Sequence, residues 1–123
     1  MATPSKIRWL PAPEKHDYPA AFSYLCLIFD EKTARNLVRR LEMAKPSAFK
    51  AKDIFRASRL SLLGVSNSHV EKDRKKMLAN KKSSPLLLVR DPANGAVIIA
   101  DGYHRLCAIY SLDEDAEVPC KIA

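Results

Sequence analysis

A short polar run, Asp101-Gly102-Tyr103-His104-Arg105, follows an apolar stretch of this sequence. Residues 96–99 before it have the pattern of a strand, and residues 103–112 after it have the pattern of a helix. The first N–H groups of a helix have no partner inside the helix and lie at the positive end of its dipole. An imidazole and a guanidinium at that end favour an anion, and phosphate is the first candidate.

Each residue of this run has an expected role at a phosphate site. Gly102 allows a tight turn, and the backbone of Gly102 and Tyr103 would hold phosphate together with Arg105. His104 would donate a hydrogen bond or transfer a proton, and Asp101 would hold Arg105, orient His104 or bind a metal. Asp101 and His104 are therefore the candidate catalytic residues. A simpler alternative is that Asp101 only caps the helix and pairs with Arg105.

A second group of candidate residues lies on a basic helix that we expect to begin after a cap at Ser66 or Ser68 and to end near residue 80. His69, Lys72 and Lys76 are spaced at i, i+3 and i+7, so they share one face of this helix. The alternative is that this face is simply solvated. No second pair of His or Cys residues completes a zinc site, so we expect no metal held by the protein alone.

The composition limits the class of protein. The 123 residues carry a formal charge of +7 and contain three glycines, so a Gly-rich Walker loop is excluded. The three cysteines, Cys26, Cys107 and Cys120, are an odd number, and we expect them to be reduced and mostly buried. No signal peptide is visible and the longest apolar stretch, residues 20–29, is too short to span a bilayer. We expect a cytoplasmic protein without a membrane partner.

The surrounding pattern predicts an α+β fold. Residues 17–29 and 30–45 have helical periodicity, with caps at Asp17 and Asp30, and the first of these helices is expected to be largely buried. A strand near residue 48, a short helix, an irregular stretch and the basic helix follow. Residues 86–89 and 96–99 form a hairpin around a Pro-Ala-Asn-Gly turn. After the helix at 103–112, a last strand contains Pro119, which predicts an edge strand or a strand start.

The second part of the chain resembles the ParB–sulfiredoxin fold superfamily. The resemblance covers about residues 48–123, and residues 1–47 form a helical extension that we expect to pack on this domain. It rests on the order of elements and on these segments: Lys52-Asp53-Ile54, Ser84-Pro85-Leu86-Leu87-Leu88-Val89, the run from Ile99 to Ala108, and Glu117-Val118-Pro119-Cys120.

The resemblance implies that the turn from Gly102 to Arg105 binds nucleotide phosphates and that the basic helix, with His69, Lys72 and Lys76, also contacts the nucleotide. ATP or CTP with Mg²⁺ is then the expected cofactor. Sulfiredoxins carry Gly-Cys-His-Arg in this turn, and partition proteins carry a Gly-Glu-Arg-Arg type of sequence. Tyr103 stands at the sulfiredoxin cysteine position, and a phenol does not replace a thiolate nucleophile. Because the sequence stops at residue 123, we do not expect a sliding DNA clamp.

Three functions follow as hypotheses. The first is binding of a nucleotide or another phosphorylated ligand at Asp101–Arg105, with phosphoryl transfer or hydrolysis left open. The second is a ParB-like DNA-binding or nuclease module, which requires the basic helix and the arginines of the second helix to form one patch. The third is a non-catalytic interaction protein that docks a protein partner, or a second copy of itself, through the N-terminal helices.

Overall fold

The computed structural model describes residues 7–64 and 66–123, and within these ranges the chain is a mixed α+β fold, as the sequence predicts. The helices are α1 (Asp17–Leu25), α2 (Glu31–Met43), α3 (Ala51–Ser58), α4 (Ser68–Leu78) and α5 (Tyr103–Leu112). The strands are β1 (Ser47–Lys50), β2 (Leu86–Asp91), β3 (Ala96–Asp101) and β4 (Glu117–Ile122), and a short 3₁₀ helix, η1 (Pro92–Asn94), joins β2 to β3. Val65, which lies in the stretch predicted to be irregular, is outside the described residues.

The four strands form one sheet in the order β1-β4-β2-β3. The β2–β3 hairpin and the β1–β4 pair are antiparallel, whereas β2 and β4 run parallel. The prediction that Pro119 marks an edge strand or a strand start is wrong, because β4 lies between β1 and β2 and Pro119 is its third residue. The pairing with β2 begins only at Cys120, so the missing N–H of Pro119 falls before that ladder.

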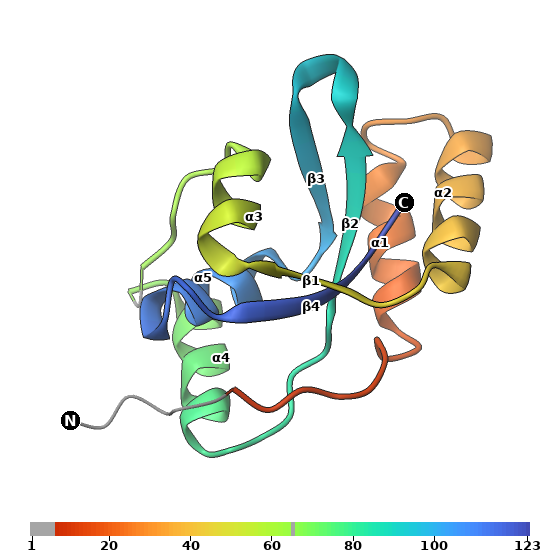
Figure 1. The fold of residues 1–123 in the computed structure, drawn as a ribbon. Helices are drawn as coiled ribbons and strands as arrows, with labels where there is room; N and C mark the ends of the chain where they lie inside the picture. Colours follow the sequence, from red (N-terminus) through yellow and green to blue (C-terminus); the bar gives the residue numbers. More distant parts are fainter. Residues whose placement is uncertain (1–6, 65) are drawn as a thin grey trace.

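Helices cover both faces of the sheet (Figure 1). Because side chains alternate along a strand, Leu86 and Leu88 of β2 pack with α3, α4 and α5, whereas Leu87 and Val89 pack with α1 and α2. These four side chains are at most 2% exposed. The continuous apolar run of β2 is therefore explained by a strand that is buried on both faces.

The first helix is shorter and more exposed than its sequence suggests. Helix α1 ends at Leu25, and Cys26 to Ile28 form a turn. Tyr24 and Ile28 are 41% and 48% exposed, and Cys26 is exposed, whereas Cys107 and Cys120 are buried as expected. The prediction that this helix is largely buried was wrong, because only one side of α1 meets the sheet and α2.

The predicted helix caps were correct in one case and wrong in two. Asp30 caps α2, since its carboxylate accepts a hydrogen bond of 2.7 Å from the Thr33 N–H. Asn67, rather than Ser66 or Ser68, caps α4. Asp17 does not cap α1; it is the first helical residue and its buried side chain binds elsewhere.

The segment before α1 is fastened to the segment that precedes β2. Trp9 and Ser83 form an isolated parallel bridge, in which the Leu10 N–H donates to the Ser83 carbonyl at 2.8 Å. The Asp17 carboxylate accepts hydrogen bonds from the Glu14 N–H and from the Ser84 hydroxyl. Residues far apart in the chain are thus held together directly beside the polar run at the end of β3.

Among the described residues, no helix has the length and apolar character needed to cross a membrane. The division between residues 47 and 48 remains a prediction from sequence. Structurally, α1 and α2 supply one apolar layer of the sheet, through Ala21, Leu25, Ala34, Leu37 and Leu41. One face of the sheet is therefore covered by helices of residues 1–47, and the other face by helices of residues 48–123.

Candidate functional site

Gly102 makes the turn between β3 and α5. Its φ is +110°, a conformation that residues with a side chain rarely adopt. A Cβ at this position would lie 2.8 Å from Leu86 Cγ and 2.9 Å from Arg105 Nη2. Glycine is therefore required here both by the backbone conformation and by the close approach of the core and the guanidinium.

The N-terminus of α5 is open. Gly102 is its N-cap and provides no side-chain cap. The first N–H bonded inside the helix is that of Leu106, which donates to the Gly102 carbonyl at 2.9 Å. The N–H groups of Tyr103, His104 and Arg105 precede this bond, so they are the orphan donors that an anion at a helix start would accept from.

Arg105 is fixed in place by three hydrogen bonds. Its Nε donates to the Ser84 carbonyl at 3.0 Å, and its Nη2 donates to the Pro85 carbonyl at 3.3 Å and to Asp101 Oδ2 at 3.1 Å. The side chain is 18% exposed. Nη1 makes no hydrogen bond to a residue that the structure describes.

Asp101 holds Arg105 and does not cap the helix. Its side chain is 17% exposed and forms the ion pair with Arg105. Burial raises the pKa of Asp101, and the nearby Arg105 only partly opposes that rise. Of the roles considered for Asp101, the geometry therefore favours the positioning of the guanidinium.

The basic helix α4 faces this turn across a polar pocket of about 230 Å³. The rings of His69 and His104 lie with their centroids 5.0 Å apart, which joins the two helices at the pocket. The structure thus brings together every predicted ligand-binding residue and Asp101. The pocket is lined by His69, Lys72, Asp73, Lys76, Asp101, Gly102, Tyr103, His104 and Arg105.

Asp73 is the lining residue that the sequence reasoning missed. It follows His69 by four positions and precedes Lys76 by three, so the helical spacing that grouped the basic residues also places Asp73 beside them. Its carboxylate gives the pocket an acceptor next to its cations. No group of three or more His, Cys, Asp or Glu side chains forms a metal site within the described ranges.

Tyr103 and Cys107 lie on the side of α5 that is covered by the loop before α4. The Tyr103 hydroxyl donates to the Ser61 carbonyl, and its ring centroid lies 5.5 Å from that of His104. Burial raises the pKa of Tyr103, and burial also raises the pKa of the Cys107 thiol, which is fully buried. These environments favour the neutral phenol and the neutral thiol, so neither group is activated as a nucleophile.

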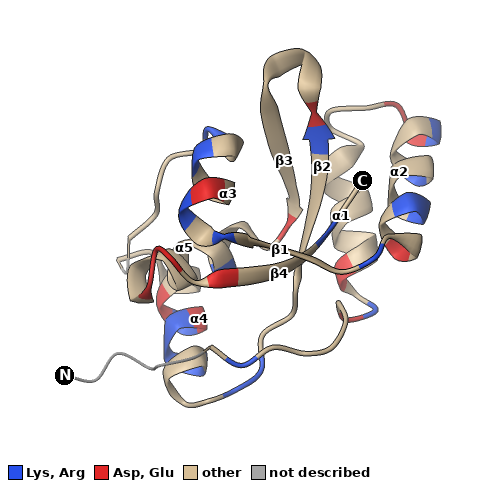
Figure 2. Ribbon diagram, in the orientation of Figure 1, with Lys and Arg blue, Asp and Glu red and all other residues tan. Residues whose placement is uncertain are grey.

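The arginines of α2 do not form one patch with α4. Lys and Arg are spread over α2, α3 and α4 in Figure 2. Helix α2, with Arg35, Arg39 and Arg40, packs on the opposite face of the sheet from α4. The single surface that the nucleic-acid hypothesis requires is therefore not formed.

No protein-family model, curated protein or solved structure matches the chain. The geometry of the α4–α5 pocket combines orphan backbone donors, a fixed guanidinium and two lysines around one small volume. Such a set of groups suits an anion with several oxygen atoms.

Proposed function

We propose that this chain binds a nucleotide or another phosphorylated ligand, through its phosphate, in the pocket between α4 and the N-terminus of α5. The observation that carries the proposal is the convergence of two helices on one polar pocket. Helix α4 brings His69, Lys72 and Lys76, and α5 brings His104 and Arg105. The resemblance of residues 48–123 to the ParB–sulfiredoxin superfamily supports the same assignment.

The charges and donors divide into two sets in this proposal. On one side, the phosphate accepts hydrogen bonds from Arg105 Nη1 and from the first N–H groups of α5. Asp101 and two carbonyls hold the guanidinium in a fixed orientation for this contact. Lys72 and Lys76 are exposed and contribute their charge from α4. Asp73 would supply a carboxylate oxygen to a Mg²⁺ that accompanies a nucleotide, since Asp101 already binds Arg105.

The size of the pocket limits what it holds. Its volume of about 230 Å³ is below the roughly 300–1,000 Å³ that is typical of pockets for drug-sized ligands. We therefore expect the phosphate end of the ligand to lie in the pocket and the remainder to lie outside. Binding should depend strongly on the number of phosphates and weakly on the identity of a base.

His104 is the residue that would take part in a reaction on the bound phosphate. It lies in the first turn of α5, lines the pocket and contacts the ring of His69. An imidazole in this place can give a proton to a phosphate oxygen or accept one from an attacking hydroxyl. Phosphoryl transfer or hydrolysis is thus the class of reaction that we propose for the site, with Asp101 as the positioning residue for Arg105.

Calorimetric titration of ATP, CTP, GTP and inorganic pyrophosphate, each with Mg²⁺, tests the binding. We expect Lys76→Ala to weaken the affinity for ATP by about tenfold, since it removes a charge-assisted contact. Lys75→Ala is the matched control, because Lys75 is exposed on the same helix but does not line the pocket. We expect the control to change the affinity by less than about twofold.

Two results would contradict the proposal. One is the absence of binding of all four compounds at millimolar concentration. The other is an equal loss in Lys75→Ala and Lys76→Ala, which would indicate attraction to a basic helix rather than a defined pocket. Release of inorganic phosphate from ATP by the wild type but not by His104→Asn, with unchanged binding, would assign the reaction to His104.

A further inference from the structure

A second cavity of about 430 Å³ lies between α3 and the β2–β3 hairpin. It is on the same face of the sheet as the α4–α5 pocket but shares no lining residue with it. Its apolar floor includes Ile54 of α3, Leu88 of β2 and Ile122 of β4. Ile54 and Leu88 are at most 3% exposed, so the base of this cavity reaches the core.

The cavity exists because small residues face each other across it. Ala57 lies on the α3 side, and Gly95 and Ala96 lie on the hairpin side. Helix α3 also packs toward α5, where the rings of Phe55 and Tyr110 lie 5.2 Å apart, so its larger side chain does not fill the space. Arg59 donates from Nη2 to the Gly95 carbonyl at 3.5 Å and links α3 to the end of the hairpin.

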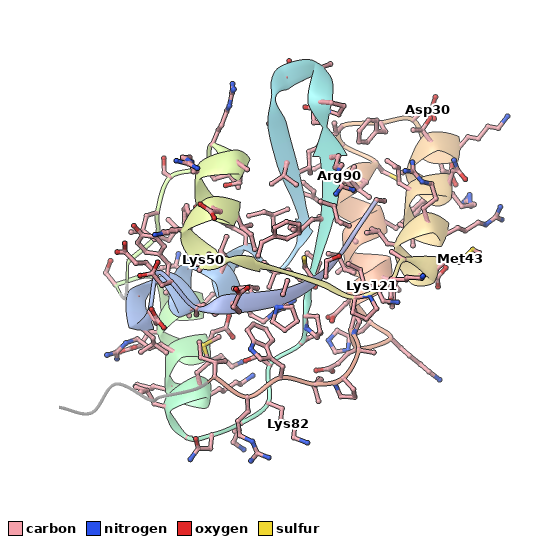
Figure 3. All side chains as sticks on the ribbon, in the orientation of Figure 1. Asp30, Met43, Lys50, Lys82, Arg90 and Lys121 are labelled. Carbon is pink, nitrogen blue, oxygen red and sulfur yellow. The ribbon has the colours of Figure 1, made fainter. Side chains whose placement is uncertain are left out.

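Two charged residues, Asp53 and Arg90, also line the cavity, and they differ in whether they form an ion pair. Asp53 has a cationic neighbour, since its Oδ1 lies 3.6 Å from Arg56 Nη2. Arg90 projects from the hairpin strand β2 (Figure 3), and no ion pair of the described residues includes it. The charged group in the lining that is left to bind a ligand is therefore a guanidinium, which prefers a carboxylate or sulfonate.

We propose that this cavity binds a small organic anion with an apolar body, such as an aryl-alkyl carboxylate. The body lies against Ile54, Leu88 and Ile122, and the carboxylate meets Arg90. The volume falls in the range of roughly 300–1,000 Å³ that is typical of small-molecule sites, and a mostly apolar wall with a few polar groups is their usual lining. This site is separate from the α4–α5 pocket and does not depend on the function proposed for that pocket.

Three compounds with one body and different heads test the proposal: 4-phenylbutyrate, 4-phenylbutanol and 4-phenylbutylamine. Titration into the ¹⁵N-labelled protein, followed by heteronuclear NMR, locates the binding by the amide shifts of Ala57, Gly95 and Val97. We expect the acid to bind about tenfold more tightly than the alcohol, because it adds a charge-assisted contact. Arg90→Gln should remove that difference and leave binding of the alcohol unchanged.

A second variant tests the location independently of charge. Ala57→Leu places a larger side chain in the cavity, and it should weaken the binding of both the acid and the alcohol. Its melting temperature and NMR spectrum show whether the fold is retained, and Arg40→Gln on α2 is the control for a remote arginine.

Four outcomes would overturn the proposal. They are no amide shifts at the cavity with any compound, tighter binding of the amine than of the acid, an unchanged preference for the acid in Arg90→Gln, and concentration-dependent dimerisation that Ala57→Leu abolishes. The last would identify a second copy of the chain as the occupant of the cavity.

Discussion

Gly102 is the residue on which the turn between β3 and α5 depends most directly. We expect Gly102→Ala to lower the free energy of unfolding by about 1–3 kcal/mol, because it combines a left-handed backbone with a Cβ that meets Leu86 and Arg105. Urea denaturation measures this change. Gly64→Ala is the matched control, since a Cβ there meets no atom within 4 Å among the described residues outside its chain neighbours, and it should shift the value by less than about 0.5 kcal/mol. Equal effects at both glycines would refute the argument.

Asp101 should make the stability depend on pH in a defined direction. Burial raises its pKa in the folded state above the ordinary value of 3.8. A carboxyl with a raised folded pKa stabilises the fold when it is protonated, and this contribution is lost as the pH rises through the folded pKa. We therefore expect the difference in unfolding free energy between the wild type and Asp101→Asn to fall as the pH increases from 3 to 7. Denaturant titrations at each pH measure it, and a rising difference would show that the ion pair outweighs burial.

Most of the residues that line the α4–α5 pocket were predicted from the sequence, but the contacts that they make were not. Local spacing was sufficient to group His69, Lys72 and Lys76 and to place Arg105 at a helix start. The carbonyls that fix Arg105 belong to Ser84 and Pro85, some twenty positions away in the chain. Such contacts depend on how β2 and β3 pair, and no local pattern contains that information.

At the scale of elements, Ser84 links three parts of the fold. Its hydroxyl binds Asp17 at the start of α1, its carbonyl accepts from Arg105 of α5, and it lies just before β2. We expect Ser84→Ala to lower the free energy of unfolding by about 1–3 kcal/mol, because the buried Asp17 carboxylate loses a donor.

Thermal or urea unfolding measures the effect of Ser84→Ala. The control is Ser23→Ala, at an exposed position of α1, which should change the value by less than about 0.5 kcal/mol. If the two substitutions have the same effect, the hydrogen bond between Ser84 and Asp17 contributes nothing to stability.

The order and type of the elements followed from periodicity, turns and caps, which are local properties of the chain. The length of α1 and the central position of β4 in the sheet did not follow from these local properties, because both depend on which elements pack together. Apolar residues at Tyr24 and Ile28 extend the helical pattern, but their side of the chain stays 41% and 48% exposed in the described structure. Proline excludes a central strand only where that strand is paired on both sides, and at Pro119 β4 is paired with β1 alone, because the β2 ladder begins at Cys120.

At the scale of the whole molecule, the N-terminal helices are a structural cover of the sheet. Removal of residues 1–46 would expose Leu87, Val89 and Ala100, which α1 and α2 bury. We expect residues 47–123 alone to lose the cooperative thermal transition and to bind a hydrophobic dye. The control is Leu27→Ser in the full chain, because Leu27 is 83% exposed and its change should leave the transition intact.

A cooperative transition of residues 47–123, at a melting temperature close to that of the full chain, would contradict this expectation. It would favour the sequence-based division into an extension and an independent domain. In that case the N-terminal helices would be available as a docking surface for a protein partner. Calorimetric and circular-dichroism melts of the two proteins distinguish these cases.

The position of β4 has a consequence for synthesis on the ribosome. This strand is the last element of the described fold to be made, yet it joins β1 to the β2–β3 hairpin in the sheet. Helices and the hairpin can form as the chain emerges, but the two halves of the sheet stay apart until residue 122 has left the tunnel. Throughout that interval the backbone edge of β2 that pairs with β4 in the finished sheet has no strand partner, and an unpaired edge of this kind can join a strand of another chain.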